Sequence, residues 1–163
     1  NNPDNVTLRY RMESENPPVI PLRLKIEINT REHFAVFDTV HHPFKVSSPW
    51  FEGQTDVRTY ALDELLATKL RALYQRRKGR DLFDLWIGLG LKGVDPSRIA
   101  AAFRKYMSAG GDKVSRKEFE KNLEAKVASR QFNDDLRPLL TPAIRYDAGE
   151  AARVVNEKLL SKL

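Results

Sequence analysis

The 163-residue sequence contains no cysteine. A disulfide framework, a cysteine-ligated zinc site and a thiol nucleophile are therefore excluded, and the composition fits a reducing compartment. No apolar run approaches the roughly 20 residues that a membrane-spanning helix needs. Residues 1–5 are mostly uncharged and polar, unlike the start of a signal peptide. These absences predict a cytoplasmic protein that does not insert into a membrane.

Several short catalytic motifs are also missing. No Gly-x-Ser-x-Gly surrounds a serine, and Gly110-Gly111 lacks the flanking glycines of a phosphate-binding loop, so it indicates the end of a helix. The histidines His33, His41 and His42 lack the spacing of a metal site. The sequence therefore gives no support for a serine hydrolase, a dinucleotide-binding enzyme or a histidine-ligated metal centre.

Positive charge is concentrated in one segment. The net charge is +6, and six of the twelve residues from 69 to 80 are basic while none is acidic. Such a segment is typical of phosphate binding, either free phosphate or nucleic acid, and a solvated helix face is the alternative. The six residues are Lys69, Arg71, Arg76, Arg77, Lys78 and Arg80.

The first part of the chain has the alternation of β-strands. Apolar and polar residues alternate over residues 6–12 and again over 22–28, which predicts two paired antiparallel strands, each half-buried. Prolines between them predict a connection longer than a two-residue hairpin. Residues 30–56 are predicted to form loop with one or two short strands, such as Phe44 to Val46.

From Tyr60 onward the apolar spacing becomes helical. A stripe of leucines predicts a helix that is broken at Gly79, and a second helix is predicted from Arg80 to about Leu89. Asp95-Pro96 predicts the start of a helix that runs to about Met107. The leucines of the stripe are Leu62, Leu65, Leu66, Leu70 and Leu73.

Two later segments have the pattern of a capping box, Ser115 to Glu118 and Asp147 to Glu150, the second before a terminal helix. Strands thus come first and helices follow. This order predicts an α+β fold in which residues 1–60 form a sheet region and residues 61–163 form a helical bundle.

Lys69 and two aspartates are candidate functional residues. Lys69 falls beside the leucine stripe, so it either extends its ammonium to solvent or points it into a cleft at a phosphate. Asp81 and Asp84 share one helix face, where they could cap the helix, form structural ion pairs, orient a cation or assist proton transfer. Glu27, on the polar side of a strand, either faces water or contributes to a metal site.

Together these segments resemble the AbiEii nucleotidyltransferase toxins, the toxin half of type IV toxin-antitoxin systems, within the DNA polymerase β-like superfamily. The resemblance covers roughly residues 22–90. It rests on the segments 24–29 (LKIEIN) and 62–73 (LDELLATKLRAL), followed at the right distance by Arg76, Arg77, Lys78, Arg80, Asp81 and Asp84.

The resemblance implies a role for each matching residue. Lys69, Asp81 and Asp84 would be catalytic, and Lys69 would also bind the phosphates of the incoming nucleotide together with Arg76 and Arg80. Arg77 and Lys78 would contact nucleic acid, and Glu27 would bind Mg²⁺. The implied reaction is attack by a hydroxyl of an RNA acceptor, such as tRNA, on the α-phosphate of a nucleoside triphosphate, and an antitoxin would neutralise the protein.

The sequence departs from the family pattern because it contains no Asp-x-Asp. It also does not begin with methionine. We therefore expect a C-terminal part of a longer protein, with the remnant of a nucleotidyltransferase sheet, that folds but does not transfer nucleotides. Ala61 stands where the family tends to have a capping serine or threonine, which should weaken the helix start by about 1 kcal/mol.

Two other functions remain open. In the first, the chain is a non-catalytic nucleic-acid-binding module whose cations spread over a convex surface. Under the enzyme interpretation, Glu27, Lys69 and Asp84 would instead converge on one cleft wall. In the second, the helices form a scaffold that binds an antitoxin.

Overall fold

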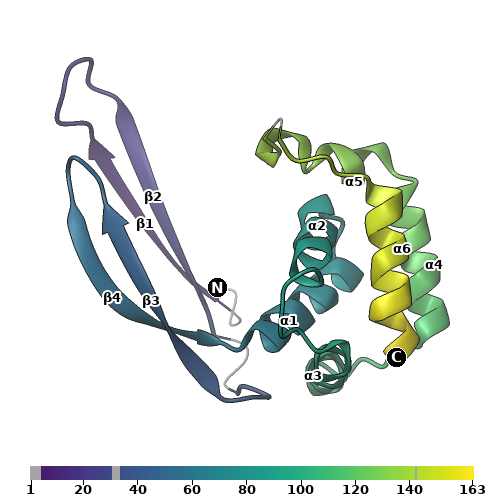
Figure 1. Ribbon diagram of the computed structural model, residues 1–163. Coiled ribbons are helices and arrows are strands. Elements are labelled where there is room, and N and C mark those ends of the chain that lie inside the picture. Colours follow the sequence, from purple (N-terminus) through teal and green to yellow (C-terminus); the bar gives the residue numbers. More distant parts are fainter. Residues whose placement is uncertain (1–4, 31–33, 142) are drawn as a thin grey trace. The chain divides into compact units, whose positions relative to one another are not determined.

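The computed structural model describes residues 5–30, 34–141 and 143–163 (Figure 1). His33 lies outside the described residues. The described part contains four antiparallel strands in two hairpins, followed by six α-helices and two short 3-10 helices, which confirms the predicted α+β fold. The chain divides into two compact units, residues 1–34 and residues 35–163. The division between a sheet region and a helical region after residue 60 stays a prediction about domains.

The first unit is a β-hairpin. Strand β1 (Asn5–Glu13) pairs antiparallel with β2 (Pro21–Asn29), so the predicted pair is confirmed. The connection, residues 14–20, contains a cis peptide bond between Pro17 and Pro18. It is closed by a hydrogen bond of 3.0 Å from the Ser14 amide to the carbonyl of Ile20.

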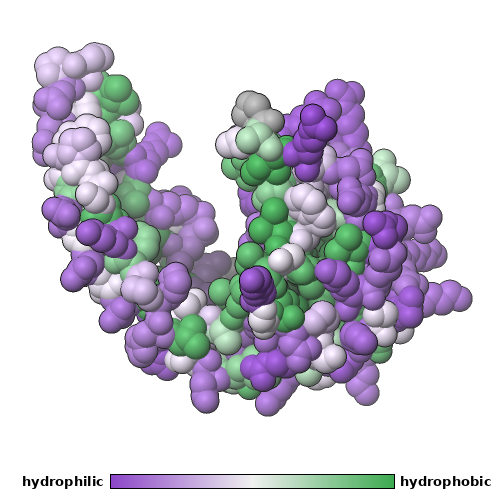
Figure 2. Space-filling model, in the orientation of Figure 1, coloured by the Kyte–Doolittle hydropathy of each residue, from purple (hydrophilic) through white to green (hydrophobic). Residues whose placement is uncertain are grey.

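The predicted half-burial of these strands is wrong. All eight apolar residues of the pair lie on one face because the register places them opposite one another, yet each side chain is 40–49% exposed. A two-stranded hairpin supplies a neighbouring strand but no second layer to cover a face. Hydrophobic residues accordingly reach the surface of the strands in Figure 2. The eight are Val6, Leu8, Tyr10, Met12, Leu22, Leu24, Ile26 and Ile28.

The second unit begins with another hairpin, where a loop with short strands was predicted. Strands β3 (Thr39–Ser47) and β4 (Glu52–Tyr60) each have nine residues. The predicted strand from Phe44 to Val46 lies within β3. The predicted loop around it is wrong because Pro43 is tolerated in a two-stranded sheet, in which each strand has one unpaired edge. The Ser48 hydroxyl oxygen accepts a hydrogen bond of 3.0 Å from the Phe51 amide and fixes the turn.

Six α-helices follow, and the second unit packs around the first of them. Their bounds are α1 (Leu62–Gln75), α2 (Gly79–Gly88), α3 (Pro96–Ala109), α4 (Arg116–Val127), α5 (Arg130–Asp134) and α6 (Ala148–Lys158). Helix α1 contacts α2, α3 and α4. The short 3-10 helices cover Arg137–Leu139 and Leu160–Lys162.

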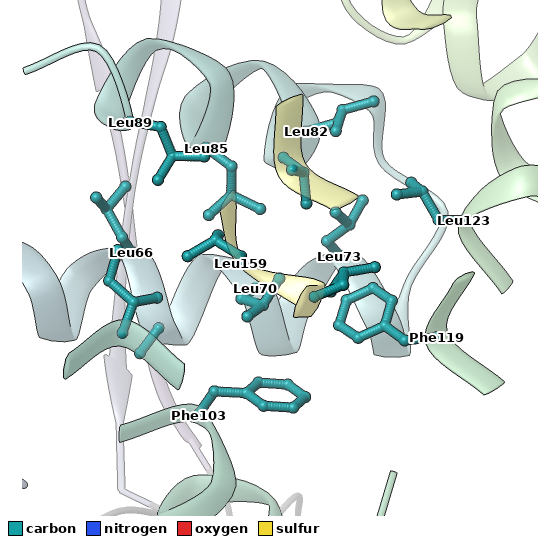
Figure 3. Packing of buried hydrophobic residues seen from close by; sticks show 14 of the residues in the cluster. Leu66, Leu70, Leu73, Leu82, Leu85, Leu89, Phe103, Phe119, Leu123 and Leu159 are labelled. Atoms are coloured by element: carbon teal, nitrogen blue, oxygen red, sulfur yellow. The ribbon is translucent and has the colours of Figure 1, made fainter. Parts of the chain in front are cut away.

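The core forms where the leucines of α1 meet side chains from the other helices. Leu66, Leu70 and Leu73 are at most 4% exposed, and Figure 3 shows them between residues of α2, α3 and α4. Leu62 and Leu65 are 40% and 37% exposed, so the predicted leucine stripe is wrong at these two positions. The buried face of α1 instead continues through the two acidic residues of its first turn, whose carboxylates accept hydrogen bonds.

The predicted helix starts are confirmed by their hydrogen bonds. Asp95 accepts one from the Ser97 amide at 2.8 Å, and Asp147 accepts one from the Glu150 amide at 2.7 Å. Ser115 and Glu118 form the complete capping box of α4. Ala61 provides no side-chain cap for α1, as expected. None of the described helices is long and apolar enough to cross a membrane.

Candidate functional site

Lys69 lies on α1 and faces two acidic side chains of α2. Its Nζ is 2.7 Å from Oδ2 of Asp84 and 3.9 Å from Oδ1 of Asp81. The side chains of Lys69 and Asp84 are each 39% exposed, whereas Asp81 is fully buried. The structure therefore brings these three predicted residues together, with a partly exposed lysine side chain near a buried carboxylate.

Arg76 completes this cluster from the C-terminal end of α1. Its Nε and one terminal amino group each donate a hydrogen bond of 2.7 Å, to the two carboxylate oxygens of Asp81. The hydrogen bonds with Asp81 are the main reason that the pKa of Arg76 is raised above its usual value. The four residues of the cluster are two cations and two anions, and only Asp81 is shielded from water.

The geometry of this four-residue cluster depends on the short connection between α1 and α2. Gly79 is the first residue of α2, and a Cβ atom there would lie 2.2 Å from the backbone carbonyl oxygen of Phe132 on α5. Lys78 precedes it, and its Nζ is 3.1 Å from Oδ1 of Asp135. The close approach of α5 thus fixes where α2 begins, and with it the position of Asp81.

A buried lysine holds the end of α1 that carries Arg76. Lys126 of α4 is 4% exposed, and its Nζ donates hydrogen bonds to the carbonyl oxygens of Leu73 and, at 2.7 Å, Tyr74. Burial, together with the positive charge of Arg77, lowers the pKa of Lys126 to about 8. Helix α1 has no basic residue in its own last turn, so Lys126 supplies the cation there.

Sequence reasoning missed Lys126, although a signal was present. It lies seven residues after Phe119 and three after Leu123, both of which are buried on the same face of α4. A lysine at this spacing interrupts an apolar helical stripe in the same way as Lys69 does. The stripe does not reveal which carbonyl groups the ammonium reaches.

Asp63 and Glu64, at the start of α1, make structural contacts that the sequence did not predict. Glu64 is fully buried and accepts hydrogen bonds from the amides of Val36 (2.7 Å) and Phe37 (2.9 Å) and from the Tyr106 hydroxyl (2.5 Å). Burial and the bond to Glu64 raise the pKa of Tyr106 above its usual range. Acidic residues are common in the first turn of any helix, so nothing local in the sequence signals this burial.

Asp63, beside Glu64, fastens the N-terminal end of α3. It accepts hydrogen bonds from the Asp95 amide at 3.0 Å and from Nε of Arg98 at 2.8 Å. The start of α1 is therefore anchored by Asp63 and Glu64, and its end by Lys126. Lys69 and Arg76 extend from a helix that is fixed at both ends.

The remaining predicted residues differ in their surroundings. Arg77 and Arg80 are exposed and have no ion-pair partner in the part of the chain that the structure describes. Glu27 belongs to the first unit, where its carboxylate lies 2.6 Å from Nζ of Lys25 and its side chain is 58% exposed. The predicted convergence of Glu27 with Lys69 and Asp84 stays a prediction.

The second unit has an α+β fold in which a partly exposed lysine lies near a buried, arginine-bound carboxylate. Two exposed guanidinium groups nearby have no ion-pair partner among the described residues. A family model described as "Nucleotidyl transferase AbiEii toxin, Type IV TA system" matches residues 1–153. The chain belongs to this family of nucleotidyltransferase toxins, which confirms the resemblance and extends it beyond residues 22–90. No curated protein and no solved structure matches the chain.

Nucleotidyltransferases generally use a divalent metal. Mg²⁺ needs several oxygen ligands with free lone pairs. Asp81 and Asp84 are bound by cations, Glu27 contacts Lys25, and no group of three or more His, Cys, Asp or Glu side chains lies within residues 5–30, 34–141 and 143–163. The residues described here do not fit a Mg²⁺ site.

Proposed function

We propose that the protein transfers a nucleotide from a nucleoside triphosphate to a hydroxyl group of an RNA acceptor, such as tRNA, and that Lys69 contacts the triphosphate. The observation that carries this proposal is the position of Lys69, 2.7 Å from Asp84 and partly exposed above buried Asp81. Membership of the nucleotidyltransferase toxin family supports it.

The carboxylates position the lysine for this role. A free lysine side chain samples many rotamers, and fixing it before the ligand arrives reduces the entropy lost on binding. Asp81 is itself fixed by Arg76, so it acts as a positioning residue for Lys69. An ammonium has three hydrogen-bond donors, and the partly exposed lysine side chain keeps donor capacity for a phosphate oxygen.

The other residues of the cluster take complementary roles. Arg76 uses two donors on Asp81 and, as a guanidinium group has five, retains others for a phosphate. Arg80 adds positive charge for the triphosphate, and Arg77 and Lys78 attract the RNA backbone. Asp84 is exposed enough to accept the proton of the attacking hydroxyl when the triphosphate engages Lys69.

In the proposed reaction, the acceptor oxygen forms a bond to the α-phosphorus and the bond to the bridging oxygen of pyrophosphate breaks. The described residues supply cations for the triphosphate but gather no set of free carboxylates. We therefore expect the 163-residue chain to bind triphosphate and RNA without transferring a nucleotide. Robust labelling of tRNA by this chain with Mg²⁺ would contradict that expectation.

The test of the function uses the protein as its gene encodes it. Each of the four labelled triphosphates is incubated with the protein, Mg²⁺ and total tRNA, and incorporation is measured. One triphosphate should label tRNA, Lys69→Ala should abolish the label, and the control Lys105→Ala, an exposed lysine of α3, should retain it. Retained incorporation in Lys69→Ala would show that this lysine does not contact the triphosphate.

A second candidate function is non-catalytic binding of nucleic acid. It is favoured by Arg77 and Arg80, which are exposed and have no ion-pair partner within residues 5–30, 34–141 and 143–163. Under this function, the encoded protein binds tRNA but incorporates none of the four triphosphates. We further propose that the protein acts in the cytoplasm and that a cognate antitoxin neutralises it, as the type IV family implies generally.

A further inference from the structure

The β1–β2 hairpin carries a cluster of positive charge outside the segment from 69 to 80. The strand register places Arg9 directly opposite Lys25 and Arg11 directly opposite Arg23. Residues two apart in a strand share a face, so these four cations form two adjacent pairs on the polar face. All four are exposed, and they line a common hollow of about 230 Å³. We call them the hairpin cation face.

Little in the hairpin neutralises this charge. Glu27 lies 2.6 Å from Lys25, whereas Arg9, Arg11 and Arg23 have no ion-pair partner among the residues that the structure describes. Like charges directly opposite each other destabilise an antiparallel pair. A two-stranded hairpin is itself only marginally stable. An arrangement that costs stability in this way indicates an anionic ligand that neutralises the face.

We propose that the hairpin cation face binds the phosphate backbone of the RNA acceptor, an inference that rests on the proposed function for the identity of that acceptor. Opposite side chains are about 5 Å apart and neighbours along a strand about 7 Å apart. The face is therefore wide enough for several phosphates rather than one anion. Three of the four cations are arginines, whose planar guanidinium groups bind phosphate oxygens in pairs.

The opposite face of the hairpin argues against an anionic lipid surface. That face holds the eight exposed apolar side chains of β1 and β2. A hairpin bound to a membrane would bury its apolar face in the lipid, as amphipathic helices do. The hairpin cation face would then point away from the headgroups. Binding to lipid and binding through these cations therefore exclude each other in geometry.

The test compares tRNA binding by the 163-residue chain and by Arg11→Gln/Arg23→Gln over a range of salt concentrations without triphosphate. Each lost phosphate contact should lower the slope of log affinity against log salt by about 0.7 to 0.9, so the slope should fall by about 1.4 to 1.8. The affinity should fall by about tenfold or more near 0.1 M salt. The thermal stability should not fall, since like-charge repulsion is removed.

The matched control is Lys117→Gln/Lys121→Gln, which removes the same charge from two exposed lysines of α4. It should change affinity less than about twofold and leave the slope unchanged. An equal loss in both double variants would overturn the proposal, because net charge alone would then explain binding. An unchanged affinity and slope in Arg11→Gln/Arg23→Gln would overturn it as well.

Two further experiments distinguish this proposal from binding to a lipid surface and from the proposed function. Vesicles of phosphatidylcholine and phosphatidylserine test the lipid source, and a loss of vesicle binding in Arg11→Gln/Arg23→Gln with unchanged tRNA binding would overturn the proposal. Lys105→Ala, at an exposed position of α3, should retain tRNA binding. If the encoded protein binds tRNA through the hairpin cation face but incorporates no nucleotide, the proposed function fails and this inference stands.

Discussion

Arg76 binds both carboxylate oxygens of Asp81, with two hydrogen bonds of 2.7 Å. Asp81 is fully buried, while the side chain of Arg76 is 49% exposed. A buried carboxylate is tolerated only when it is hydrogen-bonded or paired with a cation. Arg76 therefore stabilises this region by pairing with the buried carboxylate of Asp81.

The first prediction is that Arg76→Ala lowers the free energy of unfolding by about 1–3 kcal/mol. Among the described residues, the carboxylate of Asp81 would keep the ion pair with Lys69, whose Nζ is 3.9 Å away. Arg76→Lys should restore less than half of the loss, because an ammonium cannot reproduce the two parallel bonds. Urea unfolding measures both variants. A stability of Arg76→Ala equal to that of the wild type would contradict the assigned role.

The second prediction is that Lys69→Ala abolishes the toxicity of the encoded protein and changes its stability by less than about 1 kcal/mol. The contact of Lys69 with Asp84 is partly exposed, and Arg76 continues to bind Asp81 in the variant. Toxicity is measured by growth at equal expression, with Lys105→Ala as the control. A melting temperature lowered as far as in Arg76→Ala would indicate that Lys69 is structural.

The third prediction is that Gly79→Ala destabilises the protein by about 1–3 kcal/mol. The added Cβ would lie 2.2 Å from the carbonyl oxygen of Phe132, a backbone atom that cannot move without displacing α5. Gly149→Ala on α6 is the control, because its close atom is a side-chain oxygen of Asp147 at 3.1 Å. Chemical denaturation of both variants tests this, and equal midpoints would show that α5 yields to the methyl group.

Local spacing was sufficient to predict one part of the site. Helical periodicity placed Asp81 and Asp84 on one face, and the short connection after α1 made it possible for Lys69 to reach them. The helix starts at Asp95, Ser115 and Asp147 depend on residues two or three positions apart, and all three were predicted. Patterns of this range are visible in a single sequence.

Contacts between distant segments could not be predicted. Glu64 accepts hydrogen bonds from amides 27 and 28 residues earlier, and Lys126 donates to carbonyls 52 and 53 residues earlier. Their burial depends on tertiary packing. Glutamate and lysine are usually exposed, so the sequence indicates the opposite of what the structure shows. The second hairpin was missed because Pro43 and the turn beginning at Ser48 suggest loop in a sequence without pairing information.

The hairpin cation face shows an intermediate case. The alternation revealed that Arg9 and Arg11 share a face and that Arg23 and Lys25 share a face. Only the register shows that the two pairs lie opposite each other, since a shift of one residue would put them on opposite faces. The long connection between the strands left this register open in the sequence.

The last prediction concerns the pH dependence that Lys126 gives to stability. Its pKa is about 8 in the folded protein and close to the ordinary value of 10.5 in the unfolded chain. Between these values the unfolded state binds more protons, so the free energy of unfolding contributed by this group rises with pH. Below pH 8, the buried charge costs the folded protein at most about 3 kcal/mol.

Lys126→Met removes this titration and also leaves the carbonyls of Leu73 and Tyr74 without their donor, at a cost of about 1–3 kcal/mol. The wild type should therefore gain stability relative to Lys126→Met as the pH is raised from about 7 to about 9.5. Urea unfolding at the two pH values measures the difference, in which groups shared by both proteins cancel. Lys121→Met, at an exposed position of α4, should show no such change. A wild-type advantage that is the same at both pH values would mean that the charge of Lys126 is not desolvated in the folded protein.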